Sequence, residues 1–168
     1  ALPAPGLYHY LRETPAGKAR IHLRLEPDGR GLLLVNAARA YQLNPSAARM
    51  AYLHLEGLPE GEAGAALSGW FAAPLKQVTA DYRDIRVQID LLTDPNQHCA
   101  LCELDLETSM PFSSAPSAPY RMDLALTYRC SNECAHCYNA RPRKYPELST
   151  DQWKLALDRI WEAGIPHV

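Results

Sequence analysis

The sequence lacks long apolar runs and has no strong excess of charge of either sign. No stretch approaches the roughly 20 consecutive apolar residues of a membrane-spanning helix, and the N-terminus lacks the basic start and apolar core of a secretory signal. The 168 residues carry a formal net charge of -2, and this near balance gives no indication of a nucleic-acid-binding surface. We therefore expect a cytoplasmic protein that has neither a membrane nor a nucleic acid as its partner.

Cysteine is scarce, its number is odd, and its distribution is uneven. The chain has five cysteines, and the segment Cys130–Cys137, which reads CSNECAHC, holds three of them. A cluster this dense does not suit a disulfide framework, so we predict metal ligation in a reducing compartment.

Regular structure is predicted on both sides of this cysteine segment. Apolar and polar residues alternate over Tyr120–Arg129, which predicts a strand. Ser149 and Gln152 form a predicted capping box at the start of a helix, and Gly164 is its predicted end. His167–Val168 would begin another strand. The predicted order is therefore strand, cysteine loop, helix and strand.

The C-x3-C-x2-C spacing in this setting resembles that of the radical S-adenosylmethionine (SAM) enzymes. The resemblance implies that Cys130, Cys134 and Cys137 ligate a 4Fe-4S cluster whose remaining iron binds the amino and carboxylate groups of SAM. In that family an electron from the cluster cleaves SAM to a 5′-deoxyadenosyl radical. His136 stands where the family keeps an aromatic residue against SAM. No residue is predicted to act as a catalytic acid, base or nucleophile.

Only the first strand-loop-helix unit of the family's partial (β/α) barrel is recognisable, and the glycine-rich SAM-binding segment that follows the second strand is missing. We therefore expect an N-terminal portion of a longer radical SAM enzyme, inactive by itself. A parallel strand without a neighbour cannot satisfy its backbone hydrogen bonds. Residues 120–168 are thus expected to depend on a partner or to be poorly ordered, and could self-associate through the exposed edge.

The front of the chain predicts a small sheet. Ile21–Glu26 and Gly31–Val35 flank the turn sequence Pro27–Arg30 and predict a β-hairpin. Tyr8–Arg12 and Ala40–Leu43 are shorter predicted strands.

Three helices are predicted after these strands, which makes the fold class α+β. Asn44 is the predicted N-cap of the first helix, which carries Ala47, Met50 and Leu53 toward the core and ends near Gly57. The second helix spans about residues 60–72 and buries an apolar group of three. The third carries an apolar stripe at helical spacing. The apolar residues of the second helix are Leu67, Trp70 and Phe71, and those of the stripe on the third are Val78, Tyr82, Ile85, Ile89 and Leu92.

This element order resembles the small winged-helix-like domain of the pyrroloquinoline-quinone chaperone type, also called a RiPP recognition element. Leu43, Asn44 and Ala47, Gly57 and the third-helix stripe carry the resemblance. It implies binding of the leader segment of a ribosomally made precursor peptide as an added strand.

The predicted groove for this leader lies between Leu32–Val35 and the helix carrying Tyr82, Arg83 and Arg86. A competing interpretation is that the stripe is plain core and that the two arginines are a solvated face.

A linker over residues 93–119 contains Cys99 and Cys102 at C-x2-C spacing, which suits either a metal knuckle or two unpaired thiols. Paired with Cys134 and Cys137, they would make a structural zinc site. That arrangement gives Cys130 no role, and its two pairs are further apart than is usual.

The predicted organisation is a peptide-binding domain over residues 1–92, the linker, and the start of a radical SAM domain over 120–168. The predicted function is part of a radical SAM enzyme that modifies a ribosomally made peptide, with the leader peptide as partner. Two alternatives stay open: a stand-alone peptide-binding module with a structural zinc, and a radical SAM enzyme acting on a small molecule.

Overall fold

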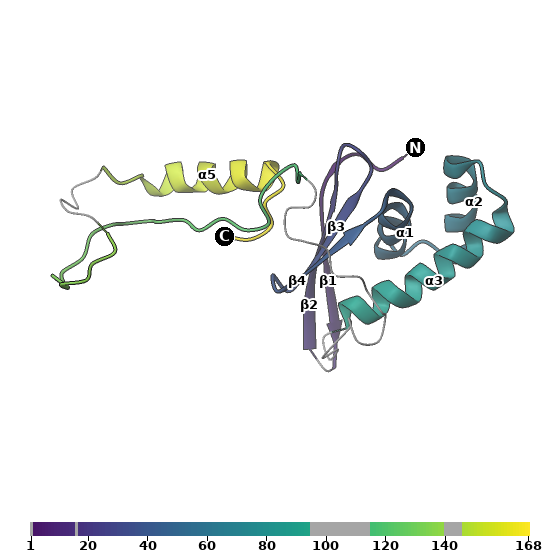
Figure 1. Cartoon of the computed structure of the whole chain (residues 1–168), viewed down its shortest axis with the longest axis horizontal. Helices are drawn as coiled ribbons and strands as arrows, with labels where there is room; N and C mark the ends of the chain where they lie inside the picture. Colours follow the sequence, from purple (N-terminus) through teal and green to yellow (C-terminus); the bar gives the residue numbers. More distant parts are fainter. Residues whose placement is uncertain (1, 16, 95–114, 140–145) are drawn as a thin grey trace. The chain divides into compact units, whose positions relative to one another are not determined.

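The computed structural model describes residues 2–15, 17–94, 115–139 and 146–168, and its chain divides into two compact units, Ala1–Ser117 and Ala118–Val168. Figure 1 shows the sheet and three helices of the first unit and the helix of the second. Within the described residues, no helix combines the length and the apolar character needed to cross a membrane.

The first unit begins with a four-stranded antiparallel sheet in the order β1-β2-β3-β4. The turn between β2 and β3 closes where Leu25 pairs with Gly31, and Glu26 N–H donates to the carbonyl of Arg30 at 2.8 Å. Gly29 supplies the positive φ of 87° within this turn. The predicted hairpin and both shorter strands are confirmed. The strands are β1 (Gly6–Thr14), β2 (Gly17–Leu25), β3 (Gly31–Val35) and β4 (Arg39–Leu43).

Three helices follow the sheet and confirm the α+β class: α1 (Pro45–Leu55), α2 (Glu60–Phe71) and α3 (Leu75–Thr93). The predicted start of α1 is confirmed, because the Asn44 side chain accepts a hydrogen bond from Ala47 N–H at 2.8 Å. Gly57 follows the helix with a φ of 78°, and its N–H donates to the carbonyl of His54. Asn44 and Gly57 therefore mark the start and the end of α1, as the sequence predicts.

The core lies between one face of the sheet and the helices α1 and α3, which contribute Ala48, Ala51, Ile89 and Leu92. All of β3 and the second half of β2 are buried, with Ile21, Leu23, Leu33 and Val35 in this core. A Cβ built on Gly31 would lie 2.7 Å from the Cβ of Ala48. The helix therefore lies against the sheet at a distance that only glycine permits at this position.

The stripe on α3 is confirmed as core. Val78, Tyr82, Ile89 and Leu92 are buried, and Ile85 is partly buried. The Tyr82 hydroxyl donates to the carbonyl of Leu58 at 3.1 Å, which satisfies the polar atom of this buried ring. Burial raises the pKa of Tyr82 above its usual value.

Two details of the predicted core differ. On α1 the prediction of Met50 and Leu53 is confirmed, but Ala47 is only partly buried while Ala48 and Ala51 are fully buried. The reason is the contact with Gly31, which turns Ala48 toward the sheet. On α2 Leu67 is buried, whereas Trp70 and Phe71 lie partly buried against the same cluster.

The second unit contains α5 (Thr150–Glu162). Its capping box is confirmed: Gln152 N–H donates to Ser149 Oγ at 3.3 Å, and Ser149 N–H donates to Gln152 Oε1 at 2.8 Å. After the helix, Gly164 adopts a φ of 82° and donates to the carbonyl of Trp161, while Ile165 donates to that of Ile160. Both ends of α5 are thus fixed by local signals.

The strand predicted over Tyr120–Arg129 is not formed, and this prediction is wrong for the structure described. The backbone there is irregular, although Met122 and Leu124 are more buried than their neighbours. Met122 N–H donates to the carbonyl of His167 at 3.0 Å, so the two predicted strands do meet at one backbone hydrogen bond. A strand needs a ladder of such bonds, and the described residues 115–139 and 146–168 form none.

Candidate functional site

The cysteine loop of the second unit, which we define as Cys130–Asn139, has neither helix nor strand. Cys130, Cys134 and Cys137 form no disulfide, and all three are exposed. Asn132 N–H donates to Cys130 Sγ at 3.5 Å, and Cys137 Sγ–H donates to the carbonyl of Asn139 at 3.2 Å. The loop therefore presents three sulfur atoms at its surface.

The three thiols do not converge in this structure. Among the described residues, no group of three or more His, Cys, Asp or Glu side chains is close enough to hold a metal ion. The donor set nevertheless fits a 4Fe-4S cluster in its chemistry, because such clusters take several cysteine thiolates and the three sulfur atoms form no disulfide. Binding would require the loop to draw its sulfur atoms together.

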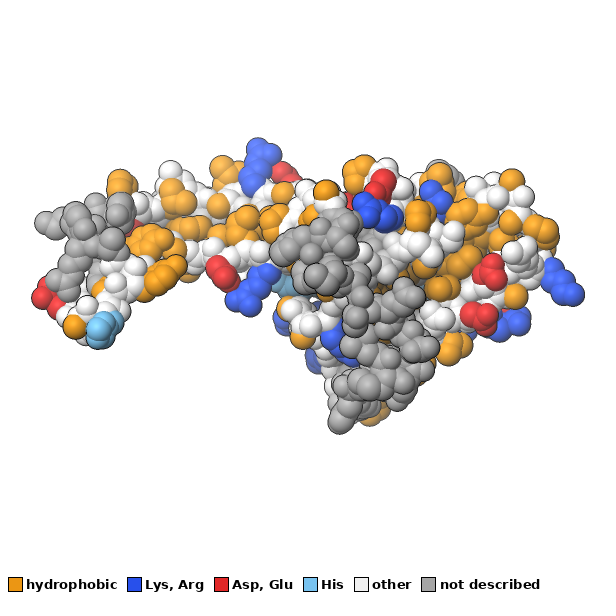
Figure 2. Space-filling view, in the orientation of Figure 1, with side chains coloured by type: hydrophobic (Ala, Val, Ile, Leu, Met, Phe, Trp, Pro, Cys, Tyr) orange, Lys and Arg blue, Asp and Glu red, His pale blue; other side chains and the backbone are white. Residues whose placement is uncertain are grey.

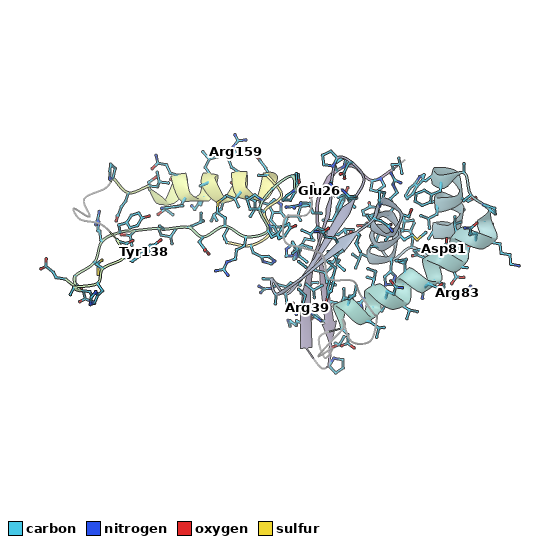
Figure 3. The ribbon with its side chains drawn as sticks, viewed as in Figure 1. Glu26, Arg39, Asp81, Arg83, Tyr138 and Arg159 are labelled. Atoms are coloured by element: carbon cyan, nitrogen blue, oxygen red, sulfur yellow. The ribbon has the colours of Figure 1, made fainter. Side chains whose placement is uncertain are left out.

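His136, the residue predicted to contact SAM, is exposed in the same loop. Tyr138, labelled in Figure 3, is completely exposed on the other side of Cys137 in the sequence. The loop therefore carries two accessible rings beside its last thiol. Sequence reasoning singled out only the histidine, because only that position matches the family pattern.

Cys99 and Cys102 lie outside the described residues. The zinc arrangement that combines them with Cys134 and Cys137 therefore stays a prediction.

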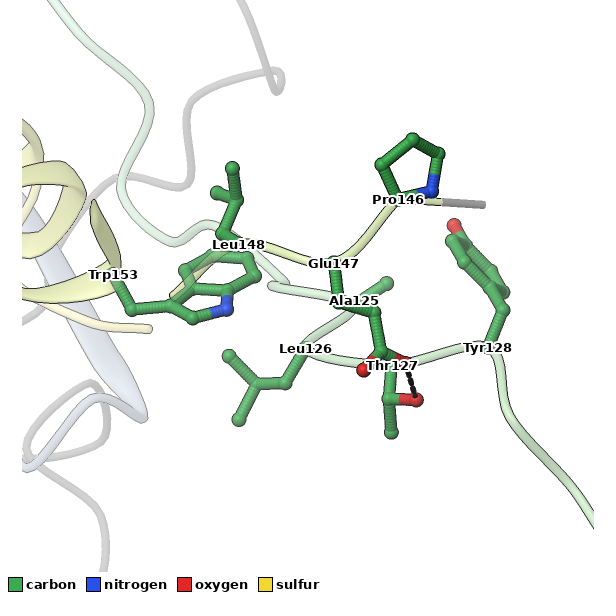
Figure 4. Close-up of a pocket in the computed structure, with 8 residues that line it drawn as sticks. All are labelled: Ala125, Leu126, Thr127, Tyr128, Pro146, Glu147, Leu148 and Trp153. Atoms are coloured by element: carbon green, nitrogen blue, oxygen red, sulfur yellow. Dashed lines mark hydrogen bonds between the residues drawn. The ribbon is translucent and has the colours of Figure 1, made fainter. Parts of the chain in front are cut away.

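A small cavity of about 210 Å³ lies beside the base of the cysteine loop (Figure 4). Leu148, just before α5, and Trp153, in its first turn, both border it, with Leu126 from the segment before the cysteines. Thr127 and Glu147 supply its polar wall, where the Thr127 hydroxyl donates to Glu147 Oε1. The complete lining is Ala125, Leu126, Thr127, Tyr128, Pro146, Glu147, Leu148 and Trp153.

Glu147 also forms an ion pair with Arg129, whose Nη2 lies 3.0 Å from Glu147 Oε2. The backbone N–H of Arg129 donates to Thr127 Oγ1 at 3.0 Å. We call Thr127, Arg129 and Glu147 the clasp. Sequence reasoning missed it, since no short motif joins a threonine and an arginine to a glutamate that lies so far along the chain.

The peptide groove predicted beside Leu32–Val35 is wrong. These residues belong to β3, which is paired on one side with β2 and on the other with β4, so no further strand can add to it. Tyr82 is buried. Arg83 and Arg86 both pair with Glu60 of α2. In the described part of the first unit, the outer strands of the sheet are β1 and β4.

Strand β4 offers a binding feature that the sequence did not reveal. Its side chains alternate between exposed and partly buried. The guanidinium of Arg39, labelled in Figure 3, has a buried Nη1 with no hydrogen-bond partner among the described residues. A buried donor without an acceptor is costly, so a carboxylate or carbonyl would be favoured here once the guanidinium turns toward it.

No protein-family model, no curated protein and no solved structure matches this chain.

Proposed function

We propose that this chain combines the leader-binding domain and the cluster-binding loop of a radical SAM enzyme that modifies a ribosomally made peptide. The observation that carries the proposal is the set of three exposed thiols, none in a disulfide, at C-x3-C-x2-C spacing. They lie between the irregular segment 120–129 and a capped helix, and the Met122–His167 hydrogen bond joins the ends of this unit. A crossover helix between two neighbouring parallel strands has this order of elements.

In this proposal, Cys130, Cys134 and Cys137 hold the 4Fe-4S cluster. With SAM bound, the cluster supplies the electron that starts radical chemistry. The chain's own part is to hold the sulfur atoms on one short loop and to offer His136 to the bound SAM. The protein thereby orients the cofactor.

The leader peptide is proposed to add to β4. This strand is an outer strand of the described sheet and precedes the helix start that carries the family resemblance. Main-chain hydrogen bonds would give affinity, and Arg39 would select a peptide with an acidic or carbonyl group at the matching position.

Anaerobic reconstitution of the full chain with iron and sulfide tests the cluster. The expected result is a sulfur-to-iron absorption band in the visible spectrum that is lost when Cys130, Cys134 or Cys137 is changed to Ser. The matched control changes Cys99 and Cys102 to Ser, which should leave iron uptake intact. Stoichiometric zinc in place of iron, lost in the Cys99 and Cys102 control, would contradict the proposal and favour the zinc module.

Peptide binding is tested with the labelled product of a short reading frame beside the gene. Arg39→Gln should weaken binding about tenfold, because a hydrogen bond to a charged group contributes about 1.5–3 kcal/mol. Arg20→Gln, at an exposed position on β2, serves as the control and should bind like the parent chain. Cluster uptake without peptide binding would instead favour a small-molecule substrate.

A further inference from the structure

The clasp joins the chain before the cysteine loop to the chain after it. Thr127 and Arg129 come directly before the first cysteine, and Glu147 comes shortly before α5. One oxygen of the Glu147 carboxylate accepts from the Thr127 hydroxyl and the other pairs with the Arg129 guanidinium at 3.0 Å. Both oxygens of this carboxylate are therefore engaged.

The three side chains form a closed cycle rather than two separate contacts. The Thr127 hydroxyl donates to Glu147 and also accepts from the backbone N–H of Arg129 at 3.0 Å. Arg129 in turn returns to Glu147 through its guanidinium. Since Arg129 is bonded to Cys130, this cycle sets the direction in which the chain enters the cysteine loop.

The Glu147 carboxylate is less exposed to solvent than the arginine with which it pairs, and it bonds to both other members of the clasp. The Glu147 side chain is 28% exposed, whereas that of Arg129 is 79% exposed. An ion pair with a largely solvated arginine contributes little by itself. Removing the Glu147 carboxylate would take a hydrogen-bond acceptor from Thr127 and an ion-pair partner from Arg129.

Closing the base of a loop reduces the entropy that is lost when groups within the loop are brought together. The thiols of the described loop are not gathered, so ligand binding must overcome that entropy. We infer that Glu147 is a positioning residue which, through Thr127 and Arg129, closes the base of the cysteine loop and so raises its affinity for a thiolate-bound metal or cluster. This inference rests on the proposed cluster-binding role of the loop.

Cobalt(II) titration of the full chain under reducing, anaerobic conditions tests the inference, because thiolate ligation of Co(II) gives a charge-transfer band without any catalytic turnover. Glu147→Ala and Thr127→Val should each raise the half-saturating Co(II) concentration about two- to fivefold, because an exposed polar pair contributes at most about 1 kcal/mol. Glu147→Gln should show a smaller loss, because its amide oxygen can still accept from Thr127. Thr127→Ser should restore the affinity of the parent chain.

Asp123→Asn is the matched control. Asp123 pairs with Arg121 at 2.9 Å in the segment before the loop, so its removal should not change Co(II) affinity. Far-ultraviolet circular dichroism of each variant should match the parent, which separates loss of positioning from loss of α5.

The outcomes distinguish the inference from the function on which it rests. Binding of Co(II) and iron by the parent chain with no weakening in Glu147→Ala and Thr127→Val would overturn the clasp alone. A parent chain that binds neither metal through Cys130, Cys134 and Cys137 would overturn the cluster proposal, and the affinity effect with it. An equal loss in Asp123→Asn would also overturn the inference, because the effect would then come from general charge rather than from the clasp.

Discussion

Gly31 occupies a position where a single methyl group decides how closely a helix and a sheet approach. An added Cβ would lie 2.7 Å from that of Ala48, and the helix backbone is close behind it. We predict that Gly31→Ala lowers the free energy of unfolding by about 1–3 kcal/mol, the usual cost of overpacking. Urea denaturation of the first unit, followed by tyrosine and tryptophan fluorescence, measures this.

The control for this change is Gly69→Ala. Gly69 lies within α2, and an added methyl group there would meet nothing within 4 Å, so alanine should stabilise the helix by about 0.5–1 kcal/mol. Opposite signs at the two glycines are the expected result. Equal effects would mean that backbone freedom, and not the contact with Ala48, determines the response at Gly31.

Asp90 on α3 links stability to pH. Burial acts to raise its pKa, but hydrogen bonds from His54 at 2.8 Å and Arg12 at 2.7 Å outweigh burial and lower it. A carboxyl with a lower pKa in the folded state stabilises the fold above its unfolded value of about 3.9. This stabilisation is lost as the pH falls through the folded pKa.

Asp90→Asn should therefore lower the unfolding free energy at pH 7 by about 0.5–1 kcal/mol, since the site is half exposed. The difference from the parent should shrink below about pH 4, where the parent carboxyl also becomes neutral. Denaturation curves at a series of pH values measure it. Asp81→Asn, at an exposed position of the same helix, is the control, and a pH-independent loss in Asp90→Asn would refute the linkage.

At the scale of elements, α5 depends on its own ends, because none of its residues is buried. Ser149→Ala removes one half of the capping box and should destabilise the helix by about 1 kcal/mol. Faster amide hydrogen exchange across Thr150–Glu162 would report it. Ser149→Asp keeps a capping oxygen and should restore protection, whereas equal exchange in the alanine and aspartate variants would show that the cap has no such role.

Elements that rest on local signals could be predicted from the sequence, and those that rest on distant partners could not. The β2–β3 hairpin follows from its turn residues, and α1 follows from Asn44 and Pro45. The strand over 120–129 was predicted from alternation alone, but alternation cannot supply a neighbouring ladder. The placement of β3 inside the sheet depends on the order of pairing, which no local pattern records.

The candidate site divides in the same way. The cysteine motif can be predicted from the sequence because Cys130, Cys134 and Cys137 all lie on one short segment. The clasp cannot be predicted in this way, because Thr127 and Glu147 are far apart in the sequence and meet only in the folded chain. The buried Nη1 of Arg39, which has no hydrogen-bond partner among the described residues, likewise results from packing, so no sequence motif predicts it.

At the scale of the whole molecule, apolar side chains are distributed differently in the two units. The first unit buries its large apolar residues in two clusters. In the second, Leu126, Leu148 and several residues of α5 are exposed, and orange surface is prominent over this unit in Figure 2. The exposed residues on α5 are Leu155, Leu157 and Trp161. Fewer buried contacts mean a smaller free energy for local opening.

Limited trypsin digestion should therefore cut α5 before α3. Lys154 and Arg159 on α5 have side chains 70% and 73% exposed, and Arg83 on α3 is 61% exposed, so access to the side chain is similar. The difference is that α3 is anchored by its buried stripe. Mass spectrometry should detect ends at Lys154 and Arg159 before an end at Arg83, and earlier cleavage at Arg83 would contradict this order of stability.

Because its three thiols are exposed, the cysteine loop can be probed directly by chemical labelling. Because Cys130, Cys134 and Cys137 are all in contact with solvent, an alkylating reagent can reach each sulfur in the metal-free chain, and each modified cysteine adds a fixed mass. Sulfur bound to a metal is no longer a free nucleophile. Peptide mapping of the labels on Cys130, Cys134 and Cys137 therefore counts the empty ligands, cysteine by cysteine, without any need for a colour or a catalytic product.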